Sequence, residues 1–478
     1  MPGAVVIGDD GVEVTGLEYH SKLVMPDSLF VAIAGFKQDG NEWIEEAVSR
    51  GAAAVVTEKK ADRSVPQMIV PDARAALADL AAKFCEYRSD DLEIYGVTGT
   101  NGKTTSCFLI KGMLLADGKR AGLITSLVYD TGRDQIPASR TTPESLDMYR
   151  LLHMMKRNQC THAVIEISSH ALVLHRVKNL CVRVALFTNI TRDHLDFHVD
   201  MDNYLNAKAR LLAMVDDEGK WAVINRDCEA FRPFFGKRQC SKMSYSLDDQ
   251  SADVHLRKYL LTPTGSTFEL CTPAGARRVT FRLTGRYNLY NALAASAAAV
   301  AGGVSLDAVT AGLENAAVIP GRLERVETGA PYTVFVDFAH TPDALRRTIE
   351  TLREISRGRI LVLFGCGGDR DRGKRPLMGE VVTSLADYAV LTSDNPRSEK
   401  PGRILDDVKP GLVKGARVEI IEDRREAIGH ILGEAREGDV VLLAGKGAEE
   451  YQEINGVRHP FSDREAATQH LHQLGYGR

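Results

Sequence analysis

A glycine-rich run between residues 98 and 105 is the segment of this chain best suited to chemistry. It follows an expected strand at Ile94–Val97 and precedes an expected helix at Ser106–Leu115. Glycines let the backbone turn tightly so that its N–H groups face phosphate oxygens, while a lysine adds positive charge and a threonine hydroxyl can bind magnesium. Val97 stands where the general phosphate-loop pattern has glycine, but strand, loop and helix together predict an ATP site. Its candidate residues are Gly99, Thr100, Asn101, Gly102, Lys103, Thr104 and Thr105.

Three later polar residues could complete a magnesium site beside Thr104. Glu166 lies at the end of an apolar run, His194 lies in Thr191–Asp196, and Lys208 lies in a helical stretch. Taken singly, each is more often structural: a strand-end carboxylate, a packed histidine or a solvated lysine. The three residues therefore carry weight only together.

The elements that must position these residues form three successive α/β regions. Short apolar runs at 29–34 and 52–57, a helical stretch at 43–50 and an Ala-rich helix within 71–87 indicate a small first unit. Strand candidates at 94–97, 163–167, 184–188 and 221–224 alternate with helices, which is typical of a parallel sheet covered on both faces. Those at 332–337, 359–364, 388–392, 418–421 and 440–444 predict a doubly wound, Rossmann-like third unit. We expect domains at 1–90, 91–321 and 322–478.

Composition narrows the class of protein. The chain has 478 residues, a formal charge of -4 and 26% charged residues, so no overall attraction to nucleic acid is expected. The N-terminus lacks a basic stretch leading into an apolar segment, and no apolar run approaches a membrane span. Eight cysteines form no CxxC pair, so neither a zinc site nor a disulfide framework is indicated. We expect a cytoplasmic protein without membrane insertion.

These motifs, in their fixed order, resemble the Mur ligase family, and the resemblance extends from Leu29 to Ser462. It covers the loop Gly99–Thr105, the segment Glu166–His170, the run Thr188–Asp196 and Lys208. It implies an ATP-dependent, amide-forming ligase. Thr104 and Glu166 would hold one magnesium ion, and Glu166, His194 and a carbamylated Lys208 a second. A lysine that has taken up carbon dioxide becomes an anionic oxygen ligand, which suits Mg²⁺.

The same resemblance implies further ATP contacts near the third unit. Segment 285–291 is similar to the family's adenine-side motif, Gly321–Glu324 matches its hinge, and Asp337–Pro342 matches a nucleotide-contacting segment. The residues implied are Asn288, Asn291, Arg322, Asp337 and His340. With Arg322, the implied catalytic set is Lys103, Glu166, His194, Lys208 and Arg322.

The run Asp394–Arg397 resembles the motif by which some members recognise meso-diaminopimelate. The distal carboxylate of diaminopimelate, which lysine lacks, suits the planar guanidinium of Arg397. The implied contacts with this amino acid are Arg370, Asp394, Asn395, Pro396, Arg397, Gly445 and Glu449.

The acceptor implied by the resemblance is UDP-N-acetylmuramoyl-L-alanyl-D-glutamate. Its expected contacts are Ser21, Phe36, Lys37, Gln38, Thr141, Thr142, Ser168 and Arg176. The chain departs from the family pattern at His20, Lys22, Arg140, Leu174 and Ala448, and most of these positions line the muramoyl end. A related ligase acting on another carboxylate therefore remains an alternative.

Two more distant alternatives also stay open. A folylpolyglutamate synthase is the nearest relative of a different substrate class, although its loop typically ends Gly-Lys-Gly-Ser and it lacks Asp394–Arg397. A nucleotide-dependent switch or nucleic-acid motor should show a basic face with interleaved aromatics, and the aromatic content is 6%. We expect a monomer whose partners are its two small-molecule substrates.

Overall fold

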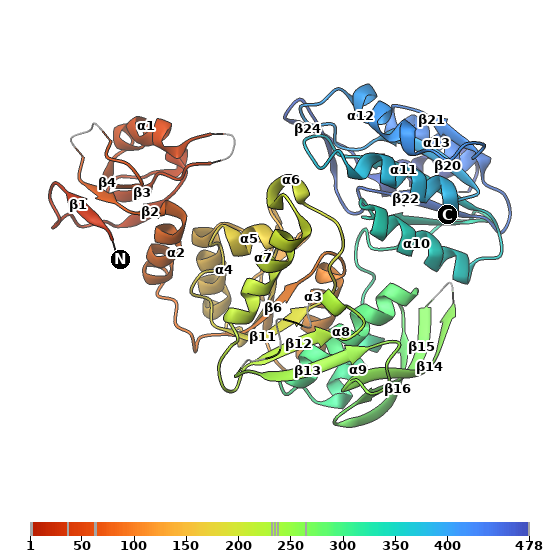
Figure 1. Ribbon diagram of the computed structural model, residues 1–478, viewed down its shortest axis with the longest axis horizontal. Coiled ribbons are helices and arrows are strands. Elements are labelled where there is room, and N and C mark those ends of the chain that lie inside the picture. Colours follow the sequence, from red (N-terminus) through yellow and green to blue (C-terminus); the bar gives the residue numbers. More distant parts are fainter. Residues whose placement is uncertain are drawn as a thin grey trace.

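The computed structural model describes residues 3–35, 38–61, 65–230, 233, 236, 239–262 and 265–476. Three large sheets follow one another along the chain, each with its own helices, and a separate two-stranded sheet lies near the C-terminus (Figure 1). We refer to the N-terminal, middle and C-terminal units by these sheets. No helix among the described residues is long and apolar enough to cross a membrane.

The N-terminal unit contains a five-stranded sheet in the order β1-β5-β4-β3-β2. Only β1 is antiparallel to its neighbour. The elements are β1 (Val5–Ile7), β2 (Gly16–Glu18), η1 (Ser21–Leu23), β3 (Ser28–Val31), η2 (Gly40–Trp43), α1 (Ile44–Ser49), β4 (Ala52–Thr57), β5 (Gln67–Ile69) and α2 (Ala73–Phe84). The helix expected at 43–50 is α1, which directly follows the 3-10 turn η2.

The middle unit is built on an eleven-stranded sheet, β16-β15-β14-β13-β12-β11-β6-β10-β7-β8-β9. The four expected parallel strands are β6, β10, β11 and β12; the structure extends the parallel core to β7 on one side and to β13 and β14 on the other, and adds antiparallel strands at both ends. The strands are β6 (Glu93–Thr98), β7 (Ala121–Ile124), β8 (Val128–Asp130), β9 (Gln135–Pro137), β10 (His162–Glu166), β11 (Val182–Phe187), β12 (Trp221–Asn225), β13 (Ser241–Ser246), β14 (Val254–Thr262), β15 (Gly265–Thr272) and β16 (Gly275–Phe281).

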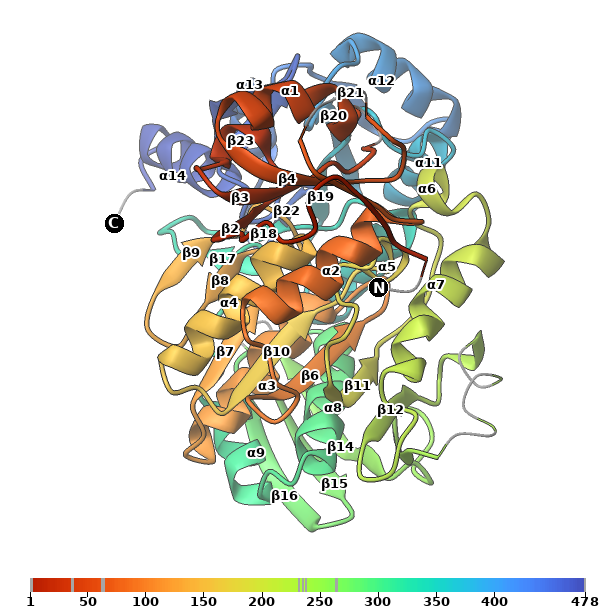
Figure 2. The same ribbon diagram turned by 90° about the vertical axis from the view of Figure 1, so that its left-hand side faces the viewer.

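Alternating side chains of the central strands enter two separate cores. Tyr95 and Val97 of β6 pack with α3, α8 and α9, whereas Ile94 of the same strand packs with α2, α4 and α7. Helix α2 lies against α4, which joins the N-terminal unit to the middle unit (Figure 2). The helices are α3 (Lys103–Ala116), α4 (Ser145–Arg157), α5 (Ser169–Val173), α6 (Leu195–His198), α7 (Met201–Ala213), α8 (Arg286–Ala301) and α9 (Leu306–Glu314).

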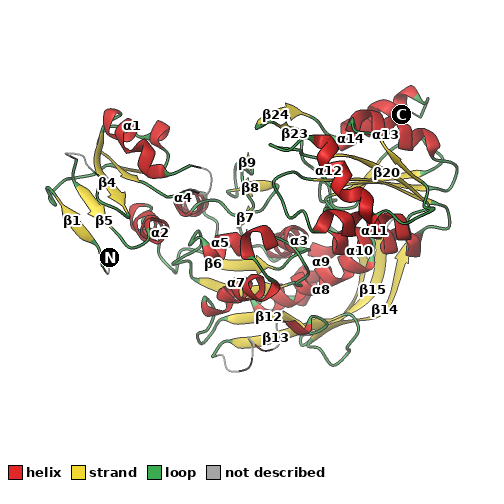
Figure 3. Ribbon diagram, turned by 45° about the horizontal axis from the view of Figure 1, so that its top comes forward, coloured by secondary structure: helices red, strands yellow, loops and turns green. Residues whose placement is uncertain are grey.

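The C-terminal unit confirms the expected doubly wound architecture. Its sheet has the order β17-β18-β22-β19-β20-β21, with only β17 antiparallel, and helices cover both faces (Figure 3). The elements are β17 (Glu324–Val326), β18 (Thr333–Asp337), α10 (Pro342–Ile355), β19 (Ile360–Cys366), α11 (Lys374–Leu385), β20 (Tyr388–Ser393), α12 (Pro401–Val408), η4 (Lys409–Gly411), β21 (Val418–Ile420), α13 (Arg424–Glu434), β22 (Val440–Ala444), β23 (Tyr451–Ile454), β24 (Val457–Pro460) and α14 (Asp463–Gln473).

Helix α3 begins three residues earlier than the sequence suggests. Gly102 caps it with a φ of 84°, so Lys103, Thr104 and Thr105 form its first turn. The expected start at Ser106 is wrong because the first turn of the helix consists of polar residues, so the apolar periodicity of the helix begins only after it. Their backbone N–H groups therefore belong to a helix N-terminus, where anions are stabilised.

Candidate active site

A single large cavity lies between the middle and C-terminal units, at the carboxyl ends of their parallel strands. Its volume is about 1450 Å³, and it is lined by the phosphate loop, the end of β10, the loop after β11, and the loops after β18, β19, β20 and β22. Ligands of open α/β sheets bind at this strand end. Pockets for one small ligand usually measure about 300–1000 Å³, so this cavity has room for more than one.

The phosphate loop has the shape that its glycines predict. Gly99 has a φ of 147°, and a Cβ there would overlap Thr188 Oγ1; Gly102 has a φ of 84°, and a Cβ there would overlap Asn291 Oδ1. The Asn101 N–H donates to Asn189 Oδ1 over 3.0 Å. These close contacts fix the shape of the loop, and a side chain at position 99 or 102 would prevent them.

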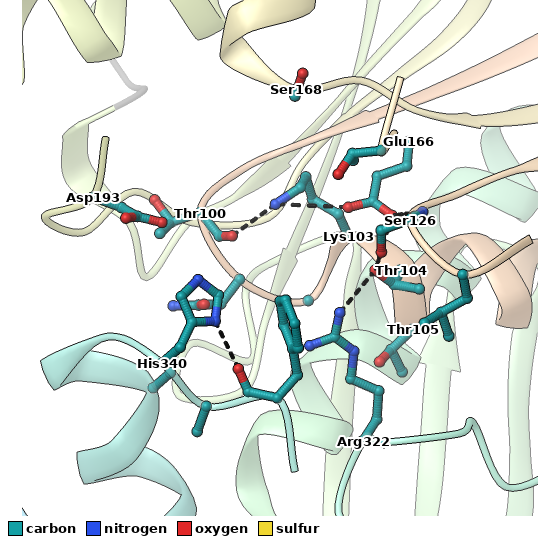
Figure 4. A pocket seen from close by; sticks show the side chains of 18 of the residues that line it. Thr100, Lys103, Thr104, Thr105, Ser126, Glu166, Ser168, Asp193, Arg322 and His340 are labelled. Carbon is teal, nitrogen blue, oxygen red and sulfur yellow. Dashed lines mark hydrogen bonds and ion pairs between the residues drawn. The ribbon is translucent and has the colours of Figure 1, made fainter. Parts of the chain in front are cut away.

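Lys103 and Thr104 converge on the carboxylate of Glu166 (Figure 4). Thr104 Oγ1 donates to Glu166 Oε2 over 2.8 Å, and Lys103 Nζ lies 3.8 Å from Glu166 Oε1. Lys103 Nζ also donates to the Thr100 carbonyl, and Arg322 Nη2 donates to Thr104 Oγ1 over 3.2 Å. These contacts place two cations and a buried carboxylate around the first turn of α3.

The oxygens of Thr104 and Glu166 fit a magnesium ion. Among the described residues no three His, Cys, Asp or Glu side chains cluster as a metal cage. Mg²⁺ usually keeps several waters and is held by one or two carboxylates together with substrate phosphates. A hydroxyl and a carboxylate 2.8 Å apart at a phosphate loop provide that donor set.

Lys208 is buried directly beneath the phosphate loop and does not line the cavity. Only 1% of the residue is exposed, and its Nζ donates to the Gly99 carbonyl over 2.6 Å. Burial, reinforced by the charge of Lys103, holds the pKa of Lys208 well below its usual value. A lowered pKa favours the neutral amine, which is the form that reacts with carbon dioxide.

His194 faces the cavity from the loop after β11. Its backbone is left-handed, with a φ of 55°, and its Nε2 lies 3.4 Å from Asp193 Oδ2. Burial lowers the pKa of His194 to about 3 despite this carboxylate. The imidazole is therefore neutral near pH 7 and can offer a lone pair to a metal.

The hinge at Gly321–Glu324 contributes Arg322 to the cavity, and the end of β18 and the loop after it contribute Asp337 and His340. Both Asp337 oxygens accept backbone N–H groups, from Leu323 over 2.6 Å and from Ala339 over 2.8 Å. The Arg322 guanidinium lies 4.5 Å from the centre of the Phe338 ring. Asp337 thus shapes the turn that delivers Arg322 to the phosphate loop.

The two expected adenine-side residues behave differently. Asn291 lines the cavity, whereas Asn288 is buried and outside its lining. Asn288 Nδ2 donates to the Thr284 carbonyl, and its Oδ1 accepts from Asn291 Nδ2 over 3.1 Å. Asn288 therefore orients Asn291 in this structure.

The opposite wall of the cavity brings together the residues expected to bind an amino acid. Asn395 Nδ2 donates to Glu449 Oε2 over 2.7 Å, and Arg397 Nη1 donates to the Gly368 carbonyl over 2.8 Å. Of the expected set, Pro396 alone does not line the cavity; Arg370, Asp394, Asn395, Arg397, Gly445 and Glu449 do. This wall combines two guanidinium groups with two carboxylates, a pattern that fits a zwitterion.

The residues expected at the muramoyl end are more dispersed. Thr141 and Ser168 line the cavity, while Thr142 Oγ1 donates to the Glu166 carbonyl and Arg176 Nη2 lies 2.8 Å from Glu144 Oε1. Ser21 and Gln38 belong to the N-terminal unit, outside the lining, and Ser21 Oγ donates to Glu46. Phe36 and Lys37 lie outside the described residues.

The structure adds residues that sequence reasoning missed. Ser126 donates its N–H to Glu166 Oε2 over 3.1 Å, Lys374 faces Asp193, and buried Lys446 donates to both Asn395 and Glu449. Lys446 lies within the Gly445–Glu449 segment already singled out, so its position was the available signal. Ser126 and Lys374 had none, because only the fold brings them to the site.

Comparison with known proteins identifies the family. Three family models match: "Mur ligase family, catalytic domain" at residues 13–85, "Mur ligase middle domain" at 97–299, and "Mur ligase, glutamate ligase domain" at 321–447. A relative from Geobacillus thermodenitrificans is 42% identical over 473 residues, covering 98% of this chain and 96% of its own. The chain belongs to the Mur ligase family.

That relative is named UDP-N-acetylmuramoyl-L-alanyl-D-glutamate--2,6-diaminopimelate ligase, and so is one from Syntrophomonas wolfei, 40% identical over 464 residues, covering 96% of this chain and 95% of its own. A solved structure of a protein with this name is 34% identical and has a TM-score of 0.66, covering 97% of this chain and 95% of its own. The fold also matches a MurF ligase from Thermotoga maritima in complex with ADP, with a TM-score of 0.66 at 20% identity, covering 98% of this chain and 99% of the other.

Proposed function

We propose that this protein is an ATP-dependent ligase that joins meso-diaminopimelate to the D-glutamate side-chain carboxylate of UDP-N-acetylmuramoyl-L-alanyl-D-glutamate, in peptidoglycan precursor synthesis. The observation that carries the proposal is the single cavity with a phosphate loop on one wall and Asp394–Arg397 on the other. The names of the 34–42% identical relatives support it.

The first step activates a carboxylate. An oxygen of the D-glutamate side chain attacks the γ-phosphorus of ATP, ADP leaves, and an acyl phosphate results. Lys103, the N-terminus of α3 and Arg322 would stabilise the charge that builds on the transferring phosphoryl group. Thr104 and Glu166 would hold one Mg²⁺, and Glu166, His194 and carbamylated Lys208 another; the ions supply charge neutralisation at the phosphates.

The second step forms the amide. The free amine of diaminopimelate attacks the acyl carbon, inorganic phosphate leaves, and the amine loses a proton. Asn395 and Glu449 would receive the amino-acid ammonium, and Arg370 and Arg397 the carboxylate at the distal end. Enclosing the acyl phosphate between the two units keeps water from hydrolysing it.

The three units divide this work in the proposal. Residues 1–90 bind the uridine end of the acceptor, 91–321 bind ATP, and 322–478 bind the amino acid. The substrates are small molecules, so a monomer in the cytoplasm that binds neither nucleic acid nor membrane suffices. The departures at His20, Lys22, Arg140, Leu174 and Ala448 concern the acceptor, so a related carboxylate is the alternative.

The test is substrate-dependent phosphate release. Purified protein with ATP and Mg²⁺ should release phosphate only when both the muramoyl dipeptide and diaminopimelate are present, and mass spectrometry should find the tripeptide. Folate with glutamate, and DNA or RNA, serve as controls for the competing classes. If phosphate is released with diaminopimelate and another carboxylate, but not with the muramoyl dipeptide, the proposed acceptor is wrong. If phosphate is released with folate or nucleic acid, the whole proposed function is wrong.

A further inference from the structure

The two arginines that face the amino-acid wall stand on adjacent loops that carry unusual backbone conformations. Arg370 follows β19, and Arg397 follows the neighbouring strand β20. Arg397 and Asp369 each have a φ of 52°. Non-glycine residues seldom adopt this left-handed region, and it persists where surrounding contacts enforce it.

Reciprocal hydrogen bonds tie the two loops together. The Asp369 N–H donates to Glu399 Oε1 over 2.6 Å, and Ser398 Oγ donates to Asp369 Oδ1 over 2.6 Å. Beside them, the Gly368 N–H donates to the Asn395 carbonyl over 2.9 Å. Each loop therefore supplies both donors and acceptors to the other.

Arg375, in the first turn of α11, contacts both of these loops. It is fully buried, with 0% of its side chain exposed, and its guanidinium donates to both Glu399 oxygens over 2.7 and 3.1 Å. It also contacts the Gly367 carbonyl and Asp407. The hydrogen bonds from Arg375 lower the pKa of Glu399 to about 2, so Glu399 is a carboxylate at every pH of interest.

Neither Glu399 nor Arg375 lines the cavity, so neither can touch the amino acid directly. Each Glu399 oxygen instead accepts one hydrogen bond from the Arg370 loop, through the Asp369 N–H or Arg372, and one from Arg375 in the first turn of α11. Neutralising the carboxylate would weaken the loop-to-loop contact while leaving both cavity arginines in the chain. A planar guanidinium binds a carboxylate in two-point fashion only when it is correctly placed, so small shifts matter.

We infer that Glu399, held by Arg375, is a positioning residue that sets the spacing of Arg370 and Arg397 and thereby the preference for an amino acid with a second, distal carboxylate. The inference rests on the proposed function and deepens it. The preference for the amino acid would then depend partly on the contact between Glu399 and Arg375, which lies outside the cavity.

Glu399→Gln is the primary test, because it keeps the shape and removes the charge. We expect the KM for diaminopimelate to rise about tenfold, the scale of one weakened charge-assisted hydrogen bond, with the KM values for ATP and the muramoyl dipeptide unchanged. The ratio of catalytic efficiencies for diaminopimelate over lysine should fall by a similar factor. A purely structural role would instead lower all activities together through loss of folded protein.

Two matched variants separate positioning from stability. Asp407→Asn removes another carboxylate from the same guanidinium without touching either loop, so it should leave the diaminopimelate-to-lysine ratio intact. Ser398→Ala removes a single hydroxyl and should lower the ratio by a few-fold in a fully folded protein. The Ser398 variant keeps the inference testable if Glu399→Gln does not fold.

A double-mutant cycle completes the experiment. In an Arg397→Ala background, Glu399→Gln should lower the ratio by less than it does in the wild type, because one of the two groups it positions is gone. A wild type that does not ligate diaminopimelate overturns the proposed function and this inference with it. A selective wild type whose ratio is unchanged in Glu399→Gln and Ser398→Ala, or falls equally in Asp407→Asn, overturns the inference alone.

Discussion

Lys374 Nζ at the start of α11 lies 3.8 Å from Asp193 Oδ1 in the loop after β11, and both residues are more than nine-tenths buried. This ion pair joins the middle unit to the C-terminal unit beside His194. Although burial opposes it, the Lys374 ammonium together with the hydrogen bond from the His194 backbone N–H keeps the pKa of Asp193 below its usual range. A charged contact between units at this depth connects their relative position to the loop that carries His194.

Lys374→Met should therefore weaken both stability and turnover. Breaking a buried pair usually costs about 3–5 kcal/mol, and we expect about 2–3 here because Asp193 keeps the His194 contact. Urea unfolding and kcat are the measurements. Arg192→Ala is the control, since its pair with Asp371 across the same boundary is half exposed on the Arg192 side and should contribute little. Equal losses in both variants would contradict the argument.

Lys103→Ala should abolish acyl-phosphate formation while leaving the amino-acid wall intact. The Lys103 ammonium lies between the Thr100 carbonyl and Glu166, where the phosphates are expected. Loss of one such charge at a transferring phosphoryl group typically costs a hundredfold or more in rate, about 3 kcal/mol. ADP release is the readout, and unchanged ADP release in the mutant would refute this role.

Lys208→Ala should lose ligation and regain part of it with short-chain carboxylic acids. The reason is that the buried amine, whose pKa is lowered, is expected to act through its carbamate, which an added carboxylate could replace. Activity is measured with and without acetate or propionate, with Lys111→Ala, whose ion pair with Asp130 lies outside the cavity lining, as the control. Full activity of Lys208→Ala without any additive would exclude the carbamate.

Arg397→Ala should remove the preference for meso-diaminopimelate over lysine. A lost charge-assisted hydrogen bond to a buried carboxylate costs roughly 1.5–3 kcal/mol, so efficiency with diaminopimelate should fall ten- to a hundredfold and change little with lysine. The ratio of efficiencies, with the muramoyl dipeptide as acceptor, is the measurement. If the wild type prefers lysine, or the mutant keeps the wild-type ratio, the assignment of the amino acid must be withdrawn.

Because of His340, we expect the free energy of unfolding to fall in mild acid. Burial, followed by repulsion from Lys374, lowers the pKa of His340 to about 4, against about 6.5 in an unfolded chain. Between pH 6.5 and 4 the unfolded state binds more protons, so this contribution is complete above 6.5 and declines as pH falls, by about 1–3 kcal/mol. His340→Asn should show a shallower decline in urea unfolding between pH 7 and 5; identical slopes would show that other groups dominate.

Local patterns were sufficient to predict most of the architecture. Apolar runs predicted the buried strands. The phosphate loop could be recognised because its conformation requires glycine at positions 99 and 102, which leaves a visible pattern in the sequence. The outer strands of the middle sheet were missed, both the parallel strands β7, β13 and β14 and the antiparallel ends, since an outer strand leaves a weak alternation in the sequence.

Site residues could be predicted where they lie together in one short stretch of sequence. Arg397 was found because its motif is contiguous. The pairing of Lys374 with Asp193, and of Arg375 with Glu399, depends on loops that meet only after folding. No spacing rule along the chain relates such residues, because the units that carry them are packed by long-range contacts.

The cavity also has an order of assembly. Its phosphate loop ends at residue 105, whereas its last lining residue is Arg458, near the end of the C-terminal unit. At roughly 5–20 residues per second, the ribosome finishes the second wall on the order of 20–70 s after the first. During that interval the nascent chain can fold a phosphate loop but has no wall for the amine. Translation order thus delays the assembly of a working site until nearly the whole chain has been made.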